Sequence, residues 1–219
     1  MKREVAELTL SDERVDRIAR RQVDKFEERR RELADGALQT LSERGYARTS
    51  LREIAQNTEF SHGTLHYYFR DKTDLIMYCV RQYKAQCVLR YDAIVADAAS
   101  ADGLAATFAD GLTVTLREDA LMHRLWYDLR SQSLFEDAFR ADVTEIDDSL
   151  ERMITRVVDR YAELAQIVPA CTSTLAYATF DGMFQRALLR HLAGVDTALD
   201  ELRDGARFLL THLVTPRPA

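Results

Sequence analysis

Cysteine, proline and glycine are all scarce in this sequence of 219 residues, which has 3 cysteines, 3 prolines and 8 glycines. Cys79, Cys87 and Cys171 lack the C-x-x-C spacing of zinc and redox sites, so we interpret them as reduced thiols that pack as small apolar residues. No stretch shows the alternation of β-branched residues that is typical of a strand. Helix-forming residues dominate instead, and this composition predicts an all-α protein.

Long apolar runs are also absent. No segment approaches the roughly 18 consecutive apolar residues that a membrane span needs. The charged N-terminus, Met1-Lys2-Arg3-Glu4-Val5, has no apolar core like that of a secretion signal. We therefore expect a cytoplasmic protein without a membrane partner.

The chain lacks an excess of positive charge, because 36 acidic residues outnumber 30 basic ones and give a formal net charge of −6. The two signs are unevenly distributed along it. Residues 1–75 hold 15 basic and 15 acidic side chains, so the whole deficit lies in residues 76–219. A segment of zero net charge can bind phosphates only if its cations gather on one face.

Apolar residues recur at spacings of three and four through most of the chain, which predicts about nine helices. Residues 1–10 show no such period and are expected to be a mobile arm or a frayed turn, followed by a helix start at Ser11. Gly45 is expected as a left-handed C-cap, Pro169 at the start of a helix, and Thr215 in a C-terminal tail. The predicted helices span about 11–44, 51–57, 61–68, 71–98, 102–116, 119–131, 134–164, 170–193 and 196–213.

Two short helices joined by a tight turn stand out between Ser50 and Phe69. Ser50-Leu51-Arg52-Glu53 is a capping box that begins the first, and Ser61 can cap the second. The start of the second helix is small and polar, as a helix that enters the major groove of DNA requires. Its inner residues, Leu65 and Phe69, can pack on the first helix. This pattern predicts a helix-turn-helix.

The run from Ala34 to Leu75 resembles the DNA-binding head of the tetracycline-repressor (TetR) family of bacterial regulators. The matching positions are Ala37, Leu41, Gly45-Tyr46, Thr49-Ser50-Leu51-Arg52-Glu53-Ile54-Ala55, Ser61-His62-Gly63-Thr64-Leu65, Tyr67-Tyr68-Phe69, Lys72 and Leu75. The resemblance implies an N-terminal three-helix bundle with the helix-turn-helix and a C-terminal helical domain for ligand binding and dimerisation. We divide the chain into an arm or helix extension (1–24), a DNA-binding domain (25–70) and a ligand-binding body (71–219).

Small polar residues and flanking phosphate clamps form the predicted DNA-binding surface. His66 departs from the family pattern, in which tyrosine is usual, so we expect DNA affinity to weaken as pH rises between about 6 and 8. Four basic residues recur at helical spacing near the N-terminus: Arg14, Arg17, Arg21 and Lys25. They either form ion pairs with interspersed acidic residues on the surface of a helix, or contact DNA phosphates outside the main groove contact. The predicted DNA-binding residues are Thr49, Ser50, Arg52, Ser61, His62, Gly63, Thr64, His66, Tyr67, Tyr68 and Lys72.

The resemblance also implies a ligand cavity between the middle helices of the body, mostly apolar with a few polar groups that orient the ligand. The aromatic side chains in this region are compatible with a cation or with a flat apolar molecule, and they can equally be plain core. The predicted lining residues are Phe108, Leu112, Met122, His123, Trp126, Tyr127, Arg130, Phe139, Val143, Tyr177, Phe180, Asp181 and Phe184.

The last two predicted helices carry more apolar surface than one core stripe requires. In the resembling family these helices pair across a two-fold axis, and a two-fold dimer suits a palindromic DNA site. The predicted dimer residues are Tyr177, Phe184, Leu188, His191, Leu192, Phe208 and Leu210.

We therefore predict a homodimeric, ligand-responsive transcription regulator, most simply a repressor released from a palindromic operator in double-stranded DNA by a small-molecule effector. We predict neither enzymatic activity, cofactor nor metal. His62 and His66 lack a third ligand, and the acidic cluster 142–151 suits a solvated helix face. Two alternatives stay open: a DNA-binding protein of this fold without a small ligand, and a helical ligand-binding protein that has lost DNA binding.

Overall fold

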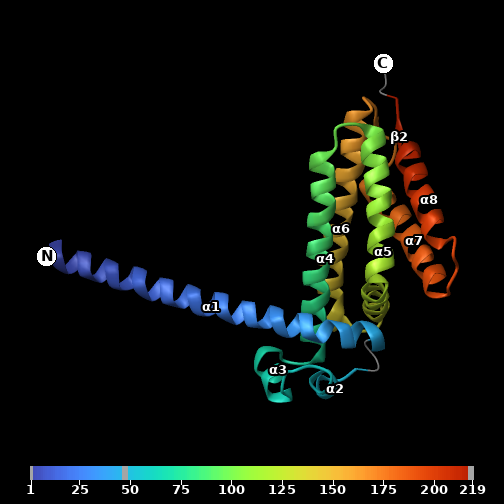
Figure 1. Cartoon of the computed structure of the whole chain (residues 1–219). Coiled ribbons are helices and arrows are strands. Elements are labelled where there is room, and N and C mark those ends of the chain that lie inside the picture. The colour runs from blue at the N-terminus through green and yellow to red at the C-terminus, as the bar shows by residue number, and fades with distance from the viewer. Residues whose placement is uncertain (1, 46–48, 217–219) are drawn as a thin grey trace. The chain divides into compact units, whose positions relative to one another are not determined.

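The computed structural model describes residues 2–45 and 49–216, with side chains from Arg21 onward except at position 42, and it is almost entirely α-helical (Figure 1). One short two-stranded ribbon accompanies eight helices in the described residues. The elements are α1 (Lys2–Arg44), α2 (Leu51–Gln56), α3 (His62–Tyr68), α4 (Lys72–Asp97), α5 (Ala101–Gln132), α6 (Asp137–Leu164), β1 (Val168–Pro169), α7 (Ser173–Leu192), α8 (Ala198–His212) and β2 (Val214–Thr215). The predicted all-α class is confirmed.

Helix boundaries mostly match the periodicity, and the start of α1 is an exception. α1 is helical from Lys2, so the expected arm at 1–10 and the expected start at Ser11 were wrong. α5 covers the two helices that were predicted at 102–116 and 119–131, and they meet at Asp119, whose non-helical angles (φ −116°, ψ 23°) mark a kink at the predicted boundary. Gly45 has a φ of 77° after α1, which confirms the predicted left-handed cap.

The ribbon was not predicted. Pro169 does not begin a helix; it lies in β1, which pairs antiparallel with β2 through Val168 opposite Thr215 and Pro169 opposite Val214. A two-residue ribbon tolerates proline because one missing N–H leaves the other ladder bonds intact. The backbone N–H of Ala170 adds a bond to the carbonyl of Leu213 at 2.8 Å. Thr215 is therefore part of a strand rather than of a free tail.

The described residues form two compact units, one from 2–41 and 49–79 and the other from 42–45 and 80–216. We call them the head and the body. The chain passes from head to body within α4, between Cys79 and Val80. The division predicted at residues 24 and 70 remains a sequence-based prediction.

The core of the head is made by side chains of the four helices that contribute to it. All are almost fully buried, and they come from the inner faces that the sequence pattern indicates. They are Leu33, Ala37, Leu41, Ile54, Leu65, Phe69, Leu75 and Ile76. Burying a large aliphatic or aromatic side chain contributes about 1.5–3 kcal/mol, so this small core is what holds α2 and α3 in place.

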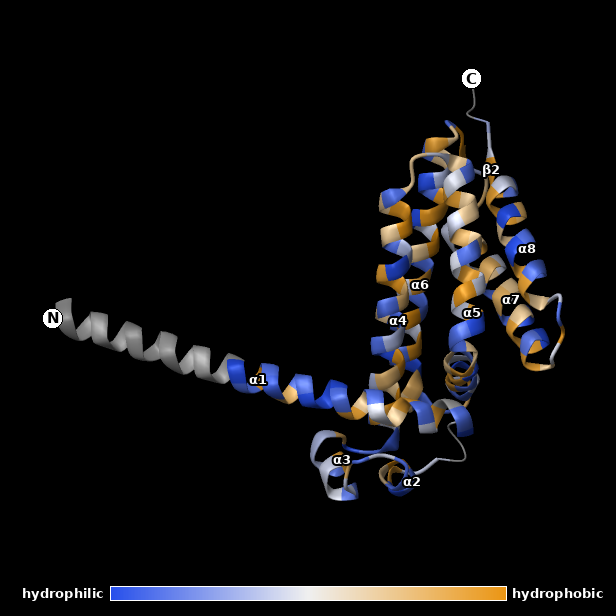
Figure 2. Cartoon of the chain, in the orientation of Figure 1, coloured by the Kyte–Doolittle hydropathy of each residue, from blue (hydrophilic) through white to orange (hydrophobic). Residues whose placement is uncertain are grey.

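The body packs α5 against α6, α7 and α8, and α7 also against α6 and α8. Figure 2 shows hydrophobic residues recurring along each of these helices with hydrophilic ones between them, the pattern of amphipathic helices. The largest buried side chains include Trp126, Phe108 and Phe139. No helix in the described part of the chain is both long and apolar enough to cross a membrane.

Candidate functional site

Serine side chains begin both short helices of the head. The N–H of Glu53 donates to Oγ of Ser50 at 3.2 Å, and the N–H of Ser50 donates to Oε2 of Glu53 at 2.8 Å. This is the predicted capping box, and it is confirmed. In α3 the N–H of Thr64 donates to Oγ of Ser61 at 3.0 Å, as predicted for a serine cap. Both helices are therefore started by side chains that satisfy otherwise unpaired N–H groups.

One face of α3 is exposed and carries His62, Gly63, His66 and Tyr67, while Leu65 is buried on the opposite face. The rings of His62 and His66 meet edge to face, with centroids 4.4 Å apart. A side chain at Gly63 would meet nothing of the chain closer than the Oγ of Ser61 at 3.8 Å. Packing within the head thus does not require glycine there, which agrees with a close approach by something outside the chain.

Two tyrosines at the end of α3 are held by an aromatic residue of α1. The ring of Phe26 lies 4.8 Å from that of Tyr68 and 6.2 Å from that of Tyr67. Tyr67 nevertheless stays 73% exposed. Its hydroxyl is thus available to an external acceptor, while its ring is oriented by neighbours.

Other predicted DNA-binding residues differ in exposure. Ser50, Arg52 and Ser61 are exposed, and Thr64, Tyr68 and Lys72 are half-buried. Thr49 is only 4% exposed. The predicted phosphate contact of Thr49 does not fit the structure, because a hydroxyl at this depth cannot reach a backbone outside the head. The side chains of Arg14 and Arg17 lie outside the described residues.

A half-buried arginine that was not predicted from the sequence ties α1 to α4 within the head. The guanidinium of Arg30 lies over the rings of Phe69, at 4.9 Å, and Tyr78, at 4.5 Å. It also pairs with Asp74 at 3.4 Å. Asp74 in turn accepts from the N–H of Arg70 at 3.0 Å. The sequence gives little indication of these contacts, because Arg30 stands in a run of charged residues that is typical of a solvated surface.

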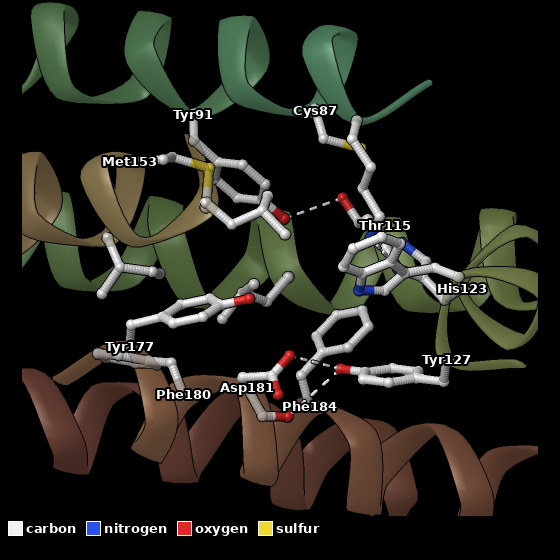
Figure 3. A pocket seen from close by; sticks show the side chains of 15 residues that line it. Cys87, Tyr91, Thr115, His123, Tyr127, Met153, Tyr177, Phe180, Asp181 and Phe184 are labelled. Atoms are coloured by element: carbon white, nitrogen blue, oxygen red, sulfur yellow. Dashed lines mark hydrogen bonds between the residues drawn. The ribbon is translucent and has the colours of Figure 1, made fainter. Parts of the chain in front are cut away.

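The body contains a cavity of about 70 Å³ bounded by α4, α5, α6 and α7 (Figure 3). Cys87 and Tyr91 reach in from α4, and Phe180, Asp181 and Phe184 face them from α7. Most of the wall is apolar. The lining residues are Lys84, Cys87, Tyr91, Leu112, Thr115, His123, Trp126, Tyr127, Leu150, Met153, Ile154, Tyr177, Phe180, Asp181 and Phe184.

A buried lysine and histidine form one polar group of this wall. Nζ of Lys84 lies 3.2 Å from Nδ1 of His123, and Nε2 of His123 lies 3.0 Å from the hydroxyl of Tyr83. Because an ammonium can only donate, Nδ1 accepts and Nε2 carries the ring proton. Burial, followed by the charge of Lys84, holds the pKa of His123 well below its usual range. Burial also lowers the pKa of Lys84 to about 8.

Two carboxylates and an arginine form a second polar group. Arg130 pairs with Asp181 at 2.5 Å and with Asp147 at 3.1 Å. The hydroxyl of Tyr127 donates to Asp181 at 3.0 Å, and the hydroxyl of Tyr177 donates to Asp147. Burial raises the pKa of Asp147, although its tyrosine and arginine partners oppose that shift. Both carboxylates are therefore matched within the chain.

A third polar group joins α4 to α5. The hydroxyl of Tyr91 donates to Oγ1 of Thr115 at 3.0 Å, and Arg90 donates to the same oxygen at 2.9 Å. Burial raises the pKa of the neighbouring Cys87 thiol. A thiol of raised pKa is a poor nucleophile at neutral pH, so Cys87 contributes to this wall as a small, mostly apolar side chain.

The cavity includes part of the predicted lining. Eight predicted residues line it: Leu112, His123, Trp126, Tyr127, Tyr177, Phe180, Asp181 and Phe184. Phe108, Met122, Phe139 and Val143 do not line it, although they are buried as well. Arg130 stands behind the wall, where it pairs with Asp181. The α4 residues Lys84, Cys87 and Tyr91 were missed, although their spacing of three and four marks one helix face.

The predicted dimer residues divide by exposure. Tyr177, Phe184, Leu188 and Leu210 are buried within the subunit. The prediction that these four residues form a dimer contact was therefore wrong, because they are not exposed to a partner. His191 is half-buried, whereas Leu192 and Phe208 are exposed. Two exposed leucines of α7, Leu175 and Leu189, were not predicted.

Residues 33–79 match the family model described as bacterial regulatory proteins of the tetR family. Over these residues the chain is similar to members of that family. The match covers the part of the head that contains the capping box of α2 and all of α3. No curated protein sequence matches the chain.

Solved structures share the fold of this chain over most of its length. A TetR transcription regulator from Haloarcula marismortui matches with a TM-score of 0.71 and 18% identity, over 86% of this chain and 100% of that one. The regulator FadR from Bacillus subtilis, in complex with stearoyl-CoA, matches with 0.68 and 18%, over 81% and 95%. A transcriptional regulator from Saccharomonospora viridis, in complex with choline, matches with 0.69 and 18%, over 87% and 100%.

Proposed function

We propose that this chain represses transcription by binding a palindromic operator as a homodimer, and that a small molecule in the body cavity releases it. The observation that carries this proposal is that α4 contributes residues both to the core of the head and to the wall of the cavity. Its first residues, among them Leu75 and Ile76, belong to the core of the head, and Lys84, Cys87 and Tyr91 of the same helix line the cavity. A ligand that contacts these residues acts on a helix that the head shares.

The head offers a surface that suits double-stranded DNA. In this proposal α3 enters the major groove, where His62, Gly63 and Thr64 face base edges. Phosphate contacts come from Ser50, Tyr67 and Lys72, which position the helix without reading sequence. The other proposed contacts are Arg52, Ser61, His66 and Tyr68, and Thr49 is left out because it is buried.

An exposed stripe along α7 suits a two-fold partner. Leu175, Ala178, Gly182, Leu189 and Leu192 are all exposed and follow one another at helical spacing. Alternating steps of three and four residues, with Gln185 between Gly182 and Leu189, match the seam of two helices packed side by side. Phe208 of α8 adds a further exposed apolar side chain. We propose this stripe as the homodimer contact in place of the buried residues predicted first.

Ligand responsiveness is supported by the cavity and by the related structures that hold stearoyl-CoA and choline. A DNA-binding function without a small ligand is the second candidate. The cavity volume of about 70 Å³ favours it, because ligand pockets usually measure about 300–1,000 Å³. Loss of DNA binding is disfavoured by the exposed and well-capped α3. We propose no enzymatic activity.

Electrophoretic mobility shift on the DNA that flanks the chain's own gene tests the proposal. Tyr67→Ala and Lys72→Ala should weaken binding to every sequence, whereas Thr64→Ala should also change sequence preference. Arg117→Ala removes an exposed cation of the body and is the matched control. Repression is read from a reporter that carries the bound DNA. Equal affinity of all four variants and the wild type would contradict the assignment of α3.

A further inference from the structure

We propose that the effector is a small carboxylate with a compact apolar body, and that its carboxylate binds the ammonium of Lys84 inside the cavity. The inference rests on the proposed function, because it names the chemical class of the molecule that occupies the same cavity. It follows from the charges in the cavity wall, from the donors that Lys84 leaves unused and from the nature of the remaining surface.

The negative charges beside the cavity are matched by the chain itself. Asp181 receives hydrogen bonds from Arg130 and from Tyr127, at 2.5 and 3.0 Å. Asp147 receives one from Tyr177 and pairs with Arg130 at 3.1 Å. A carboxylate that already accepts such bonds has little left to offer a cationic ligand. Arg130 in turn already pairs with both carboxylates.

Lys84 stands in the opposite situation. Its side chain is buried, and among the described residues no carboxylate forms an ion pair with Nζ; the charges of Asp181 and Asp147 act on the ammonium only from a greater distance. The ammonium has three N–H donors, and a single acceptor, Nδ1 of His123, lies 3.2 Å away. That histidine is neutral, because burial and the charge of Lys84 depress its pKa. A buried charge without a counter-ion in direct contact is costly, and an anion at Nζ would remove much of that cost.

The aromatic wall does not favour a cation. Nζ of Lys84 lies 5.2 Å from the ring centroid of Trp126 and 5.8 Å from that of Tyr83. The lysine therefore already occupies the ring face that attracts cations most strongly. A ligand cation in the same cavity would meet like charge. A carboxylate, in contrast, meets an ammonium that stays mostly protonated at neutral pH, since its pKa is about 8.

The rest of the cavity wall determines the polarity and the size of the part of the ligand that follows the carboxylate. Leu150, Met153, Ile154, Phe180 and Phe184 present apolar surface. A cavity of about 70 Å³ limits the body to a short chain or a single ring unless side chains move. Met153 is the flexible member of this wall and can adjust to a longer chain. Short fatty acids and aromatic acids are thus the chemical class that fits.

Isothermal titration calorimetry on the full-length protein tests the inference with three ligands that share one tail: hexanoate, hexan-1-ol and hexyltrimethylammonium. Hexanoate should bind at least about tenfold more tightly than hexan-1-ol, as expected for a charge pair in a desolvated site. Lys84→Met should abolish that preference and leave hexan-1-ol binding unchanged. Met153→Ala is the matched control, because it alters only the apolar wall and should change both affinities by a similar factor.

Several outcomes would overturn the inference. They are equal binding of hexanoate and hexan-1-ol, tightest binding of hexyltrimethylammonium, and an unchanged preference in Lys84→Met. Failure of benzoate and of every straight-chain acid from acetate to octanoate to bind at millimolar concentration would overturn it as well. Circular dichroism and thermal melting of Lys84→Met establish that the variant is folded.

Operator binding measured in parallel separates this inference from the proposed function. If hexanoate binds through Lys84 but leaves operator affinity unchanged, the ligand class stands and release by that ligand is wrong. If the protein binds its operator but no carboxylate, the ligand class is wrong while the DNA-binding function stands.

Discussion

The hydroxyl of Tyr127 donates a hydrogen bond to Oδ1 of Asp181 at 3.0 Å, and this bond links α5 to α7 at the cavity wall. Arg130, one turn further along α5, pairs with the other oxygen of the same carboxylate. Asp181 therefore holds two side chains of one helix in place. Its loss should be felt in stability as well as in ligand binding.

Replacing Asp181 should cost more stability than replacing its tyrosine partner. Asp181→Ala leaves Arg130 with Asp147 alone, and we expect a loss of about 2 kcal/mol, below the roughly 3–5 of a fully buried pair because Arg130 is partly exposed. Tyr127→Phe removes one neutral donor and should cost about 1 kcal/mol. Urea unfolding measures both changes. A larger loss in Tyr127→Phe than in Asp181→Ala would contradict this account.

The buried ammonium of Lys84 should make stability rise with pH above about 8. Its pKa is about 8 in the folded protein, whereas the ordinary value for a lysine is 10.5. Between these values the unfolded chain holds a proton that the folded protein has released, so stability increases with pH. The full gain is about 3 kcal/mol, taken from about 1.4 kcal/mol per pKa unit.

Lys84→Met provides the reference for that measurement. Urea unfolding at several values between about pH 7.5 and 10 should show the stability advantage of Lys84→Met shrinking as pH rises. Neighbouring tyrosines with raised pKa values, Tyr83 and Tyr91, lower stability at the alkaline end in both proteins, so the difference cancels them. A difference between the two proteins that does not vary with pH would show that Lys84 does not titrate in this window.

The serine caps of α2 and α3 should each stabilise the head by about 1 kcal/mol. Ser50→Ala and Ser61→Ala remove the acceptors for the N–H groups of Glu53 and Thr64. Hydrogen exchange of head amides should speed up correspondingly, while amides of the body stay unchanged. Ser61→Gly is the control, since glycine at an N-cap costs only a few tenths of a kcal/mol. Equal exchange in Ser61→Ala and wild type would rule out a stabilising cap.

Local signals explain which parts of this structure could be predicted. The capping box at Ser50 and the left-handed turn at Gly45 depend on residues close in sequence, and both were predicted. The strand at Pro169 depends on a distant segment, because β1 pairs with β2. The break at Asp119 was predicted as a boundary between two helices, and helical periodicity does not show that the chain continues there with only a kink.

For the cavity, too, the sequence predicts only some of the lining side chains. Aromatic residues of α5 and α7 were predicted to line it because the family resemblance implied a cavity between the middle helices. Lys84 was missed because lysine is almost always exposed, and nothing in its neighbouring residues indicates that Nζ reaches His123. Asp181 and Arg130 were both named, yet only the structure shows that they neutralise each other.

The stripe on α7 yields a prediction that separates dimer contact from folding. An added Cβ at Gly182 would meet no atom of the chain within 4 Å, so Gly182→Leu should leave the subunit intact. It should even favour the helix, because leucine has a higher helix propensity than glycine by roughly 0.8 kcal/mol. Between two closely packed helices, however, the larger side chain would hold the backbones apart. We expect weaker dimerisation and weaker operator binding together.

Leu189→Arg should have the same effect on assembly through charge rather than size, and Leu89→Arg is its matched control. Leu189 is 64% exposed on α7, and Leu89 is 61% exposed on α4, so the two substitutions perturb the isolated subunit equally. Analytical ultracentrifugation should find Leu189→Arg at subunit mass and Leu89→Arg at twice that mass. Because two heads on one site multiply their affinities, operator binding should fall only in the first. Dimers of unchanged stability in both α7 variants would place the two-fold contact elsewhere on the body.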